Sequence, residues 1–143
     1  RTPWVSAAEG RNFVLTMLGL MHTQPELRVV ADQVGAPTQA AGLARALWSL
    51  ALGGTTGVHH YTDGGAASWH DFAVAIQVGA LALGLVKQAI PIRPVATADF
   101  PTPARRPRYS VLDTSDTYAL LGTPATPWRH NLRITLQEIA AHG

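Results

Sequence analysis

Apolar residues recur along the chain with the three- and four-residue spacing of amphipathic helices, between capping and helix-ending residues. Five segments are expected to be helical, and their bounding residues are Asn12 and Gln24, Thr38 and Gly53, Ser68 and Gly84, Ser115 and Gly122, and Pro127 for the start of the last. In the second helix the spacing predicts a buried stripe made of Leu43, Ala44, Leu47, Trp48 and Leu50. In the last helix the inward residues are expected to be Leu132, Leu136 and Ile139.

Short runs rich in β-branched residues lie between these helices and predict strands. The expected strands are Arg1–Val5, Leu27–Val30, Gly57–Thr62 and Ile90–Val95. Two prolines interrupt the last run and confine it to a sheet edge. Because strands alternate with helices, we expect an α/β fold: one small domain over residues 1–143, with a short sheet and about five helices.

Four polar side chains stand where helix caps are expected. Asn12 lies at the entrance of the first helix, where it either caps backbone N–H groups or reaches a ligand. Thr38 and Ser115 are expected to cap the second and fourth helices. Ser68 is followed three positions later by Asp71, which is an acidic variant of the capping box.

The composition favours a folded domain with a partner. The 143 residues are 47% hydrophobic and only 14% charged, so a core can form and disorder is excluded. The apolar excess indicates that a large partner surface lies outside this chain. The net charge is +2 and Lys87 is the only lysine, which is too little to neutralise the phosphates of a nucleic acid.

The absence of cysteine removes disulfides, thiolate zinc sites and cysteine nucleophiles, and it fits a cytoplasmic location. The longest apolar stretch, 73–86, is too short to cross a bilayer, so no membrane partner is expected. Residues 1–5 lack the features of a signal peptide. Since the first residue is not methionine, we expect the chain to come from a longer protein.

Two polar clusters have simple structural interpretations. His59 and His60 are adjacent on an expected strand, so their side chains point to opposite faces and no metal site is expected. Ser68, His70 and Asp71 contain the residue types of a hydrolase triad. Their crowding at a helix start indicates capping instead, because a triad is assembled from separated segments.

The segment from Phe100 to Asp113 combines three arginines with three prolines. Proline restricts its own backbone and that of the residue before it, so the segment is expected to be a stiff loop. A stiff loop that presents guanidinium groups suits an anion, above all phosphate. The alternative is a solvated basic loop.

Two further residues are candidates for ligand contact. The four tryptophans are expected to pack in the core or at its rim. Trp4 differs, since it ends an expected strand before a loop and a helix, where sites form in α/β folds. Gln33 lies in the turn-forming loop 32–38, where it either satisfies loop backbone groups or contacts a ligand.

Five ordered segments carry a resemblance to a known family. They are Arg-Thr-Pro-Trp-Val at 1–5, Gly-Arg-Asn-Phe at 10–13, Asp-Gln-Val-Gly-Ala-Pro-Thr at 32–38, Ser-Trp-His-Asp-Phe at 68–72 and Phe-Pro-Thr-Pro-Ala-Arg-Arg-Pro at 100–107. In this order and spacing they resemble dTDP-4-dehydrorhamnose reductase, over the whole chain but only over the C-terminal portion of that enzyme.

The resemblance implies an extended short-chain dehydrogenase/reductase, in which an N-terminal Rossmann domain binds NADPH and a smaller C-terminal domain binds the nucleotide-sugar. The intact protein is then expected to reduce dTDP-4-dehydro-6-deoxy-L-mannose to dTDP-L-rhamnose. The family's catalytic Tyr-x-x-x-Lys lies upstream of the matching region; here the only lysine, Lys87, has Leu83 four positions before it, and no Gly-x-Gly-x-x-Gly run occurs. We therefore expect no catalytic residue in this chain and no turnover by the chain alone.

The resemblance also implies which residues contact substrate, namely Trp4, Asn12, Phe13, Gln33, Pro37 and Arg106. Trp4 would line the sugar and nicotinamide side, and Arg106 would clamp phosphate, with Arg105 and Arg108 as alternatives for the clamp. The expected partners are the dTDP-sugar and the missing Rossmann half, and a homodimer of the intact protein is left open.

A second interpretation is a non-catalytic binding protein, because the regulatory subunit of methionine adenosyltransferase resembles the same family. An upstream Tyr-x-x-x-Lys and binding of dTDP by the arginine loop would distinguish the enzyme from this regulator.

Overall fold

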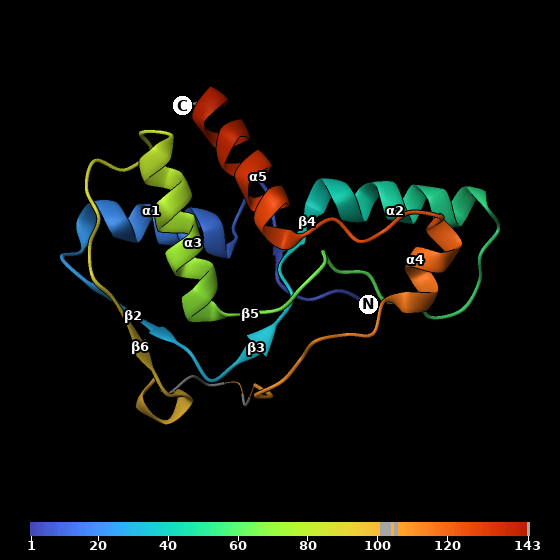
Figure 1. The fold of residues 1–143 in the computed structure, drawn as a ribbon, viewed down its shortest axis with the longest axis horizontal. Helices are drawn as coiled ribbons and strands as arrows, with labels where there is room; N and C mark the ends of the chain where they lie inside the picture. The colour runs from blue at the N-terminus through green and yellow to red at the C-terminus, as the bar shows by residue number, and fades with distance from the viewer. Residues whose placement is uncertain (101–103, 105, 143) are drawn as a thin grey trace.

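The computed structural model describes residues 1–100, 104 and 106–142, and it is an α/β fold with five α-helices among them (Figure 1). The helices are α1 (Phe13–Thr23), α2 (Ala40–Leu52), α3 (Trp69–Ala82), α4 (Ser115–Leu121) and α5 (Trp128–His142). The strands are β1 (Val5–Ser6), β2 (Leu27–Val30), β3 (Val34–Gly35), β4 (Thr38–Gln39), β5 (Ala67–Ser68) and β6 (Ile92–Val95), and a 3₁₀ turn, η1, covers Thr97–Asp99. The expected fold class is confirmed.

The strands form three two-stranded pairs rather than one sheet. β1 pairs with β4 and β2 with β6, both in parallel, whereas β3 pairs with β5 antiparallel. In the β2–β6 pair, Leu27 lies opposite Ile92 and Val30 opposite Val95. β6 therefore lies at a sheet edge, as its prolines predict.

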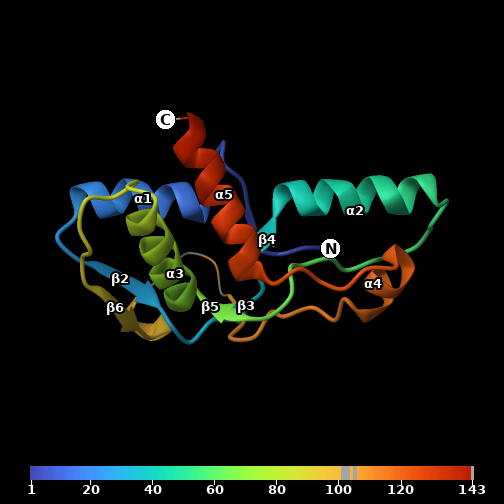
Figure 2. The same ribbon diagram turned by 45° about the horizontal axis from the view of Figure 1, so that its top comes forward.

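The hydrophobic core lies where α1, α3 and α5 meet above β2 (Figure 1). The largest fully buried apolar side chains are Phe72, Ile76, Leu136 and Val14. Gly79 lets α3 and α5 approach closely, because a Cβ at this position would lie 2.5 Å from Cδ1 of Leu136. In both ribbon views α2 and α4 lie together at the end of the molecule away from this core (Figures 1 and 2).

Several expected helix boundaries are confirmed. The Asn12 side chain accepts a hydrogen bond from the N–H of Leu15 and caps α1. Ser68 and Asp71 form both hydrogen bonds of a capping box at the start of α3. Gly122, with φ of +65°, ends α4 in the left-handed conformation that glycine favours.

Two expected strands are wrong in whole or in part. The first is limited to Val5–Ser6, because Trp4 has a positive φ of +50° that interrupts the extended backbone. Residues 57–62 form no strand: Gly57 has φ of +99°, and the hydrogen bonds of the segment to other parts of the chain are scattered, such as that from the N–H of Tyr61 to the carbonyl oxygen of Arg1.

Two expected caps are wrong as well. Thr38 is fully buried in β4, and its hydroxyl donates to the carbonyl oxygen of Ala36. The residue that precedes α2 is Gln39, whose side chain makes no cap hydrogen bond. Ser115 is the first residue of α4, and its hydroxyl donates to Asp113.

The buried stripe predicted for α2 is wrong. Only Gly42 and Ala46 are buried in this helix, whereas Leu47 is 59% and Trp48 69% exposed. Helical spacing identifies an apolar face, but nothing in the described part of the chain covers this one. On α5, in contrast, Leu132 and Leu136 are buried as expected.

Candidate functional site

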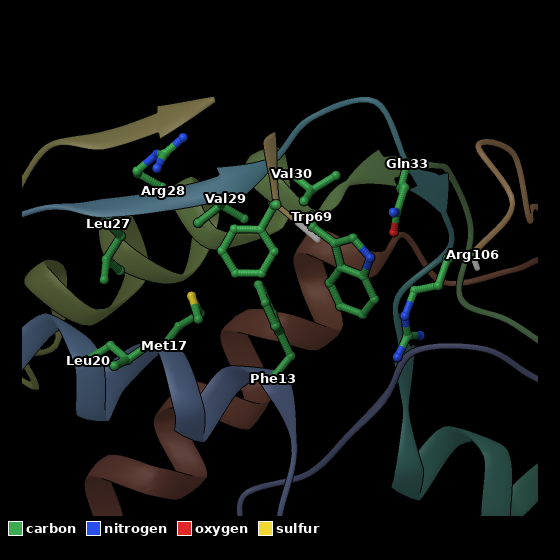
Figure 3. A pocket seen from close by; sticks show the side chains of 11 residues that line it. Phe13, Met17, Leu20, Leu27, Arg28, Val29, Val30, Gln33, Trp69 and Arg106 are labelled. Atoms are coloured by element: carbon green, nitrogen blue, oxygen red, sulfur yellow. The ribbon is translucent and has the colours of Figure 1, made fainter. Parts of the chain in front are cut away.

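Two neighbouring cavities, with volumes of about 350 and 250 Å³, lie between α1, β2, the 32–38 loop and residues 106–110. Both are lined by Gln33, Trp69 and Arg106, so these three side chains stand at the boundary between them. Figure 3 shows the larger cavity, with Arg106 beside Trp69 and Gln33 at one end and Leu20 and Leu27 at the other. We call the two cavities together the cleft.

The larger cavity is mostly apolar because a helix and a strand meet along it. α1 contributes Phe13, Met17 and Leu20, which follow one another at helical spacing, and β2 contributes the wall opposite them (Figure 3). Arg28 and Arg106 are the cationic side chains of its lining. The smaller cavity is lined by Pro3, Trp4, Pro107 and Ser110 in addition to the shared residues.

A stack of aromatic rings forms the floor of the cleft. The rings of Trp4 and Trp69 are stacked, with centroids 3.6 Å apart and planes inclined by 16°. Phe13 packs against Trp69 with a centroid separation of 4.6 Å, and Phe72 lies behind them in the core. Extensive ring contacts of this kind fix the orientation of both tryptophans.

The backbone around Trp4 is shaped to hold this stack. Trp4 is the non-glycine residue of the described chain with a positive φ, at +50°, which is uncommon for a bulky side chain. Gly35 passes directly under its ring: a Cβ there would lie 2.7 Å from Cε2 of Trp4 and 2.9 Å from Oγ of Ser110. The positive φ of Trp4 and the absence of a side chain at Gly35 together allow the ring of Trp4 to reach the cleft.

Gln33 is held in place by a short network of hydrogen bonds. Its Nε2 donates to Oγ1 of Thr97 at 3.0 Å, and that hydroxyl donates to Oδ1 of Asp32 at 2.6 Å. The backbone N–H of Thr97 also donates to Asp32, at 2.8 Å. The Thr97 hydroxyl is the main reason that the pKa of Asp32 is lowered. Gln33 as a whole is 6% exposed, and it lines both cavities of the cleft.

Arg106 supplies positive charge to both cavities. Its side chain makes no ion pair with the residues that the structure describes, whereas Arg93 pairs with Glu26 at 2.8 Å. Arg105, the first alternative for the expected clamp, lies outside the described residues, as do Pro101, Thr102 and Pro103. Arg108 lines neither cavity; its carbonyl oxygen accepts a hydrogen bond from the N–H of Val34.

The structure brings four of the six expected substrate-contacting residues to the cleft, namely Trp4, Phe13, Gln33 and Arg106. The Asn12 amide is directed to backbone instead, since it also donates to the carbonyl oxygens of Ala7 and Glu9. Pro37 is buried and lines neither cavity.

Sequence reasoning missed Trp69, Arg28 and Ser110 as lining residues of the cleft. For Trp69 a signal was present: it is the first residue after the Ser68 cap, so the capping box fixes its position at the start of α3. Nothing in the sequence indicates that its ring stacks on Trp4, 65 positions earlier, because that contact depends on the whole fold.

The described residues contain no Gly-x-Gly-x-x-Gly turn. A dinucleotide pyrophosphate is bound by a glycine-rich turn at a helix N-terminus. The strand–loop–helix unit from β1 to α1 contains Gly10, and the Asn12 side chain accepts one backbone N–H of the first helical turn, that of Leu15. Among the described residues there is no group of three or more His, Asp or Glu side chains that could hold a metal ion. No helix in the described part of the chain is long and apolar enough to cross a membrane.

Comparison with known proteins agrees with this architecture. Residues 1–141 match the family described as RmlD substrate binding domain. The chain belongs to this family. It is 39% identical to a dTDP-4-dehydrorhamnose reductase of Burkholderia thailandensis, over 97% of this chain and 50% of the relative. It is 40% identical to the spore coat polysaccharide biosynthesis protein SpsK of Bacillus subtilis, over 96% of this chain and 46% of the relative.

Solved structures of the family have the same fold. The crystal structure of a dTDP-4-dehydrorhamnose reductase from Clostridium acetobutylicum superimposes with a TM-score of 0.85 at 36% identity, over 97% of this chain and 47% of the other. The enzyme from Bacillus anthracis, solved in complex with NADP, gives 0.84 at 32% identity, over 96% and 47%. This chain therefore spans about half the length of the relatives it matches, and it corresponds to their C-terminal portion.

Proposed function

We propose that this chain is the nucleotide-sugar-binding portion of an NADPH-dependent dTDP-4-dehydrorhamnose reductase, and that its ligand lies in the cleft. The observation that carries the proposal is the position of Arg106, an arginine without an ion-pair partner in the described chain, between an apolar cavity and a stacked tryptophan pair. The names of the relatives support the ligand class.

The chemistry of the cleft matches the parts of a dTDP-sugar. A guanidinium group binds phosphate oxygens through charge-assisted, often bidentate hydrogen bonds, which suits Arg106 for the diphosphate. The apolar cavity between α1 and β2 has the size and lining of a small-molecule site and suits an uncharged ring. The amide of Gln33 and the hydroxyl of Ser110 offer hydrogen bonds beside Trp4 on the other side.

The reduction itself needs groups that this chain does not supply. When bound, NADPH would supply a hydride to the C4 keto carbon of the sugar. The residues of this chain bind and orient the sugar, and the Trp4–Trp69 stack fixes one wall against which it rests. We assign cofactor binding and proton donation to the remaining half of a full-length protein.

Titration calorimetry with dTDP tests the proposal. Arg106→Ala should weaken binding of dTDP by about 1.5–3 kcal/mol, because a charge-assisted phosphate contact is lost. Arg133→Ala is the matched control, since Arg133 is an exposed arginine of α5 that lines neither cavity, and its binding should equal that of the wild type. Equal affinities for all three proteins would move the phosphate site away from Arg106.

A further inference from the structure

The larger cavity of the cleft is a slot with α1 on one side and β2 on the other. On α1 the lining runs from Phe13 to Leu20, which is about 10 Å along the helix axis. On β2 it runs over residues 27–30, which also extend about 10 Å. Arg106 lies at one end of the slot and Leu20 at the other (Figure 3). The Arg28 side chain points away from Leu20 in this view, so the Leu20 end is apolar.

β2 borders this slot with an edge rather than with one face. Four consecutive residues, 27–30, line the slot, whereas the side chains of one face belong to alternate residues. The N–H groups of Leu27 and Ala31 each donate at 2.9 Å to a carbonyl oxygen on the β6 side. In a parallel ladder the residues in between point the other way, so the main-chain groups of Arg28 and Val30 lie at the opposite edge. No strand pairs with that edge in the described part of the chain.

A pyrimidine nucleotide held at Arg106 satisfies both walls in one orientation. Its N1 atom carries the deoxyribose and the phosphates, so C4 and C5 lie farthest from Arg106. The edge with O2, N3 and O4 is polar and suits the unpaired N–H and carbonyl groups of β2. The edge with C5 and C6 is apolar and then faces α1, where Met17 and Leu20 offer only apolar atoms. C5 is thus directed to the Leu20 end of the slot.

We infer that Leu20 is the specificity residue that distinguishes thymine from uracil, by packing against the C5 methyl group of the base. The inference rests on the proposed function in placing a nucleoside diphosphate at Arg106. Leu20 is half-buried: it packs against the rim of the core and also lines the slot. A methyl group placed against it leaves water for an apolar contact, whereas a uracil ring has no atom to fill this end.

α1 offers a matched control for Leu20. Leu15 is on the same helix, is also half-buried and also packs against the core, but it lines neither cavity of the cleft. Met17 lines the slot but is 6% exposed and belongs to the core itself, so its truncation would disturb the fold. Leu20 and Leu15 therefore form the pair that separates contact with the base from helix packing.

Titration calorimetry with dTDP and dUDP tests the inference, because these two nucleotides differ only in the C5 methyl group. The wild type should bind dTDP about fourfold or more tightly than dUDP. Leu20→Ala should bring the ratio of the two affinities close to one, because the methyl group loses its contact. Leu15→Ala should keep the ratio of the wild type.

Leu20→Phe gives a second measurement that does not depend on removing apolar contacts from α1. The larger ring should fill the end of the slot and weaken binding of dTDP more than binding of dUDP, so the preference should invert. Urea midpoints of all variants confirm that each one is folded.

Equal affinity of the wild type for dTDP and dUDP would overturn the inference and leave the proposed function in place, provided that Arg106→Ala still weakens binding. A wild-type ratio in both Leu20→Ala and Leu20→Phe would also overturn it, since the methyl group would then be recognised elsewhere. Binding of neither nucleotide would overturn the proposed function and this inference with it.

Discussion

The ring of Trp4 reaches the cleft because two unusual residues make room for it. Trp4 itself has a positive φ, and Gly35 offers no side chain where the ring passes. A positive φ is disfavoured for a tryptophan, and a glycine at position 35 is needed only because the ring lies there. Both features therefore indicate that the local backbone is adapted to the stacking of Trp4 on Trp69.

Gly35→Ala tests this arrangement. The new methyl group would lie 2.7 Å from Cε2 of Trp4, so we expect a loss of about 1–3 kcal/mol in the free energy of unfolding and weaker dTDP binding. Gly19→Ala is the control, because its Cβ meets nothing within 4 Å on α1 and should stabilise the helix slightly. Urea unfolding measures the stability of both variants. An unchanged free energy of unfolding for Gly35→Ala would show that the ring of Trp4 is not packed tightly against position 35.

Asp63 gives the molecule a distinct dependence on pH. Its carboxyl is 3% exposed; Oδ2 accepts the N–H of Gln39, and Oδ1 has no hydrogen bond to the described residues. Burial raises the pKa of Asp63 above its ordinary value of 3.8, although neighbouring Asn131 and the N–H of Gln39 oppose the rise. The folded state therefore binds this proton more tightly than the unfolded state does.

The Asp63→Asn variant should separate this effect from that of other groups. Because the folded pKa is raised, the stabilisation by protonated Asp63 is present below the unfolded pKa and is lost as the pH rises through the folded pKa. We measure the free energy of unfolding of the wild type and of Asp63→Asn by urea titration at several pH values. The value for the wild type minus that for the variant should fall between pH 3.5 and pH 7. A difference that is flat or rises with pH would contradict a buried, destabilised carboxylate.

At the scale of single elements, α3 connects the capping of a helix to the site. Ser68 accepts the N–H of Asp71 at 3.0 Å, and the Asp71 carboxylate accepts the backbone N–H and the hydroxyl of Ser68. These bonds to Ser68 also lower the pKa of Asp71. Trp69 is the next residue along the chain, so the cap holds one of the two stacked rings.

Ser68→Ala should cost about 1–2 kcal/mol in the free energy of unfolding, because the N-cap hydrogen bond is lost. It should also weaken dTDP binding through the position of Trp69. Ser115→Ala is the matched control, since that hydroxyl bonds only an exposed Asp113 and lies on α4, outside the cleft. Urea unfolding and calorimetry check both variants. If Ser68→Ala and Ser115→Ala changed the free energy of unfolding and the affinity for dTDP equally, the cap of α3 would not be what positions Trp69 in the site.

Across the whole molecule, the sequence predicts local structure better than it predicts what covers each surface. Apolar spacing and capping residues locate α1, α3 and α5, because these features act within one helix. The buried stripe of α2 is predicted wrongly for the opposite reason: spacing identifies an apolar face but does not say what covers it, and the described residues leave Leu47 and Trp48 exposed.

The candidate site shows the same division. Arg106 has a local signal in the arginine- and proline-rich sequence around it. Trp4 is singled out as the end of an expected strand, although the observed strand β1 begins only after it. The Trp4–Trp69 stack and the space under Trp4 at Gly35 arise only when segments far apart in sequence meet, so no local pattern predicts them.

The most direct test of the proposed ligand site follows the four tryptophan indole N–H signals by NMR while dTDP is added to the 143-residue chain. Trp4 and Trp69 line the cleft, whereas Trp48 is exposed on α2 and serves as an internal control. Single Trp→Phe variants assign the signals. The account predicts saturable shifts for Trp4 and Trp69, with Trp48 unchanged. Shifts confined to Trp48, or no shift at either cleft tryptophan, would contradict it.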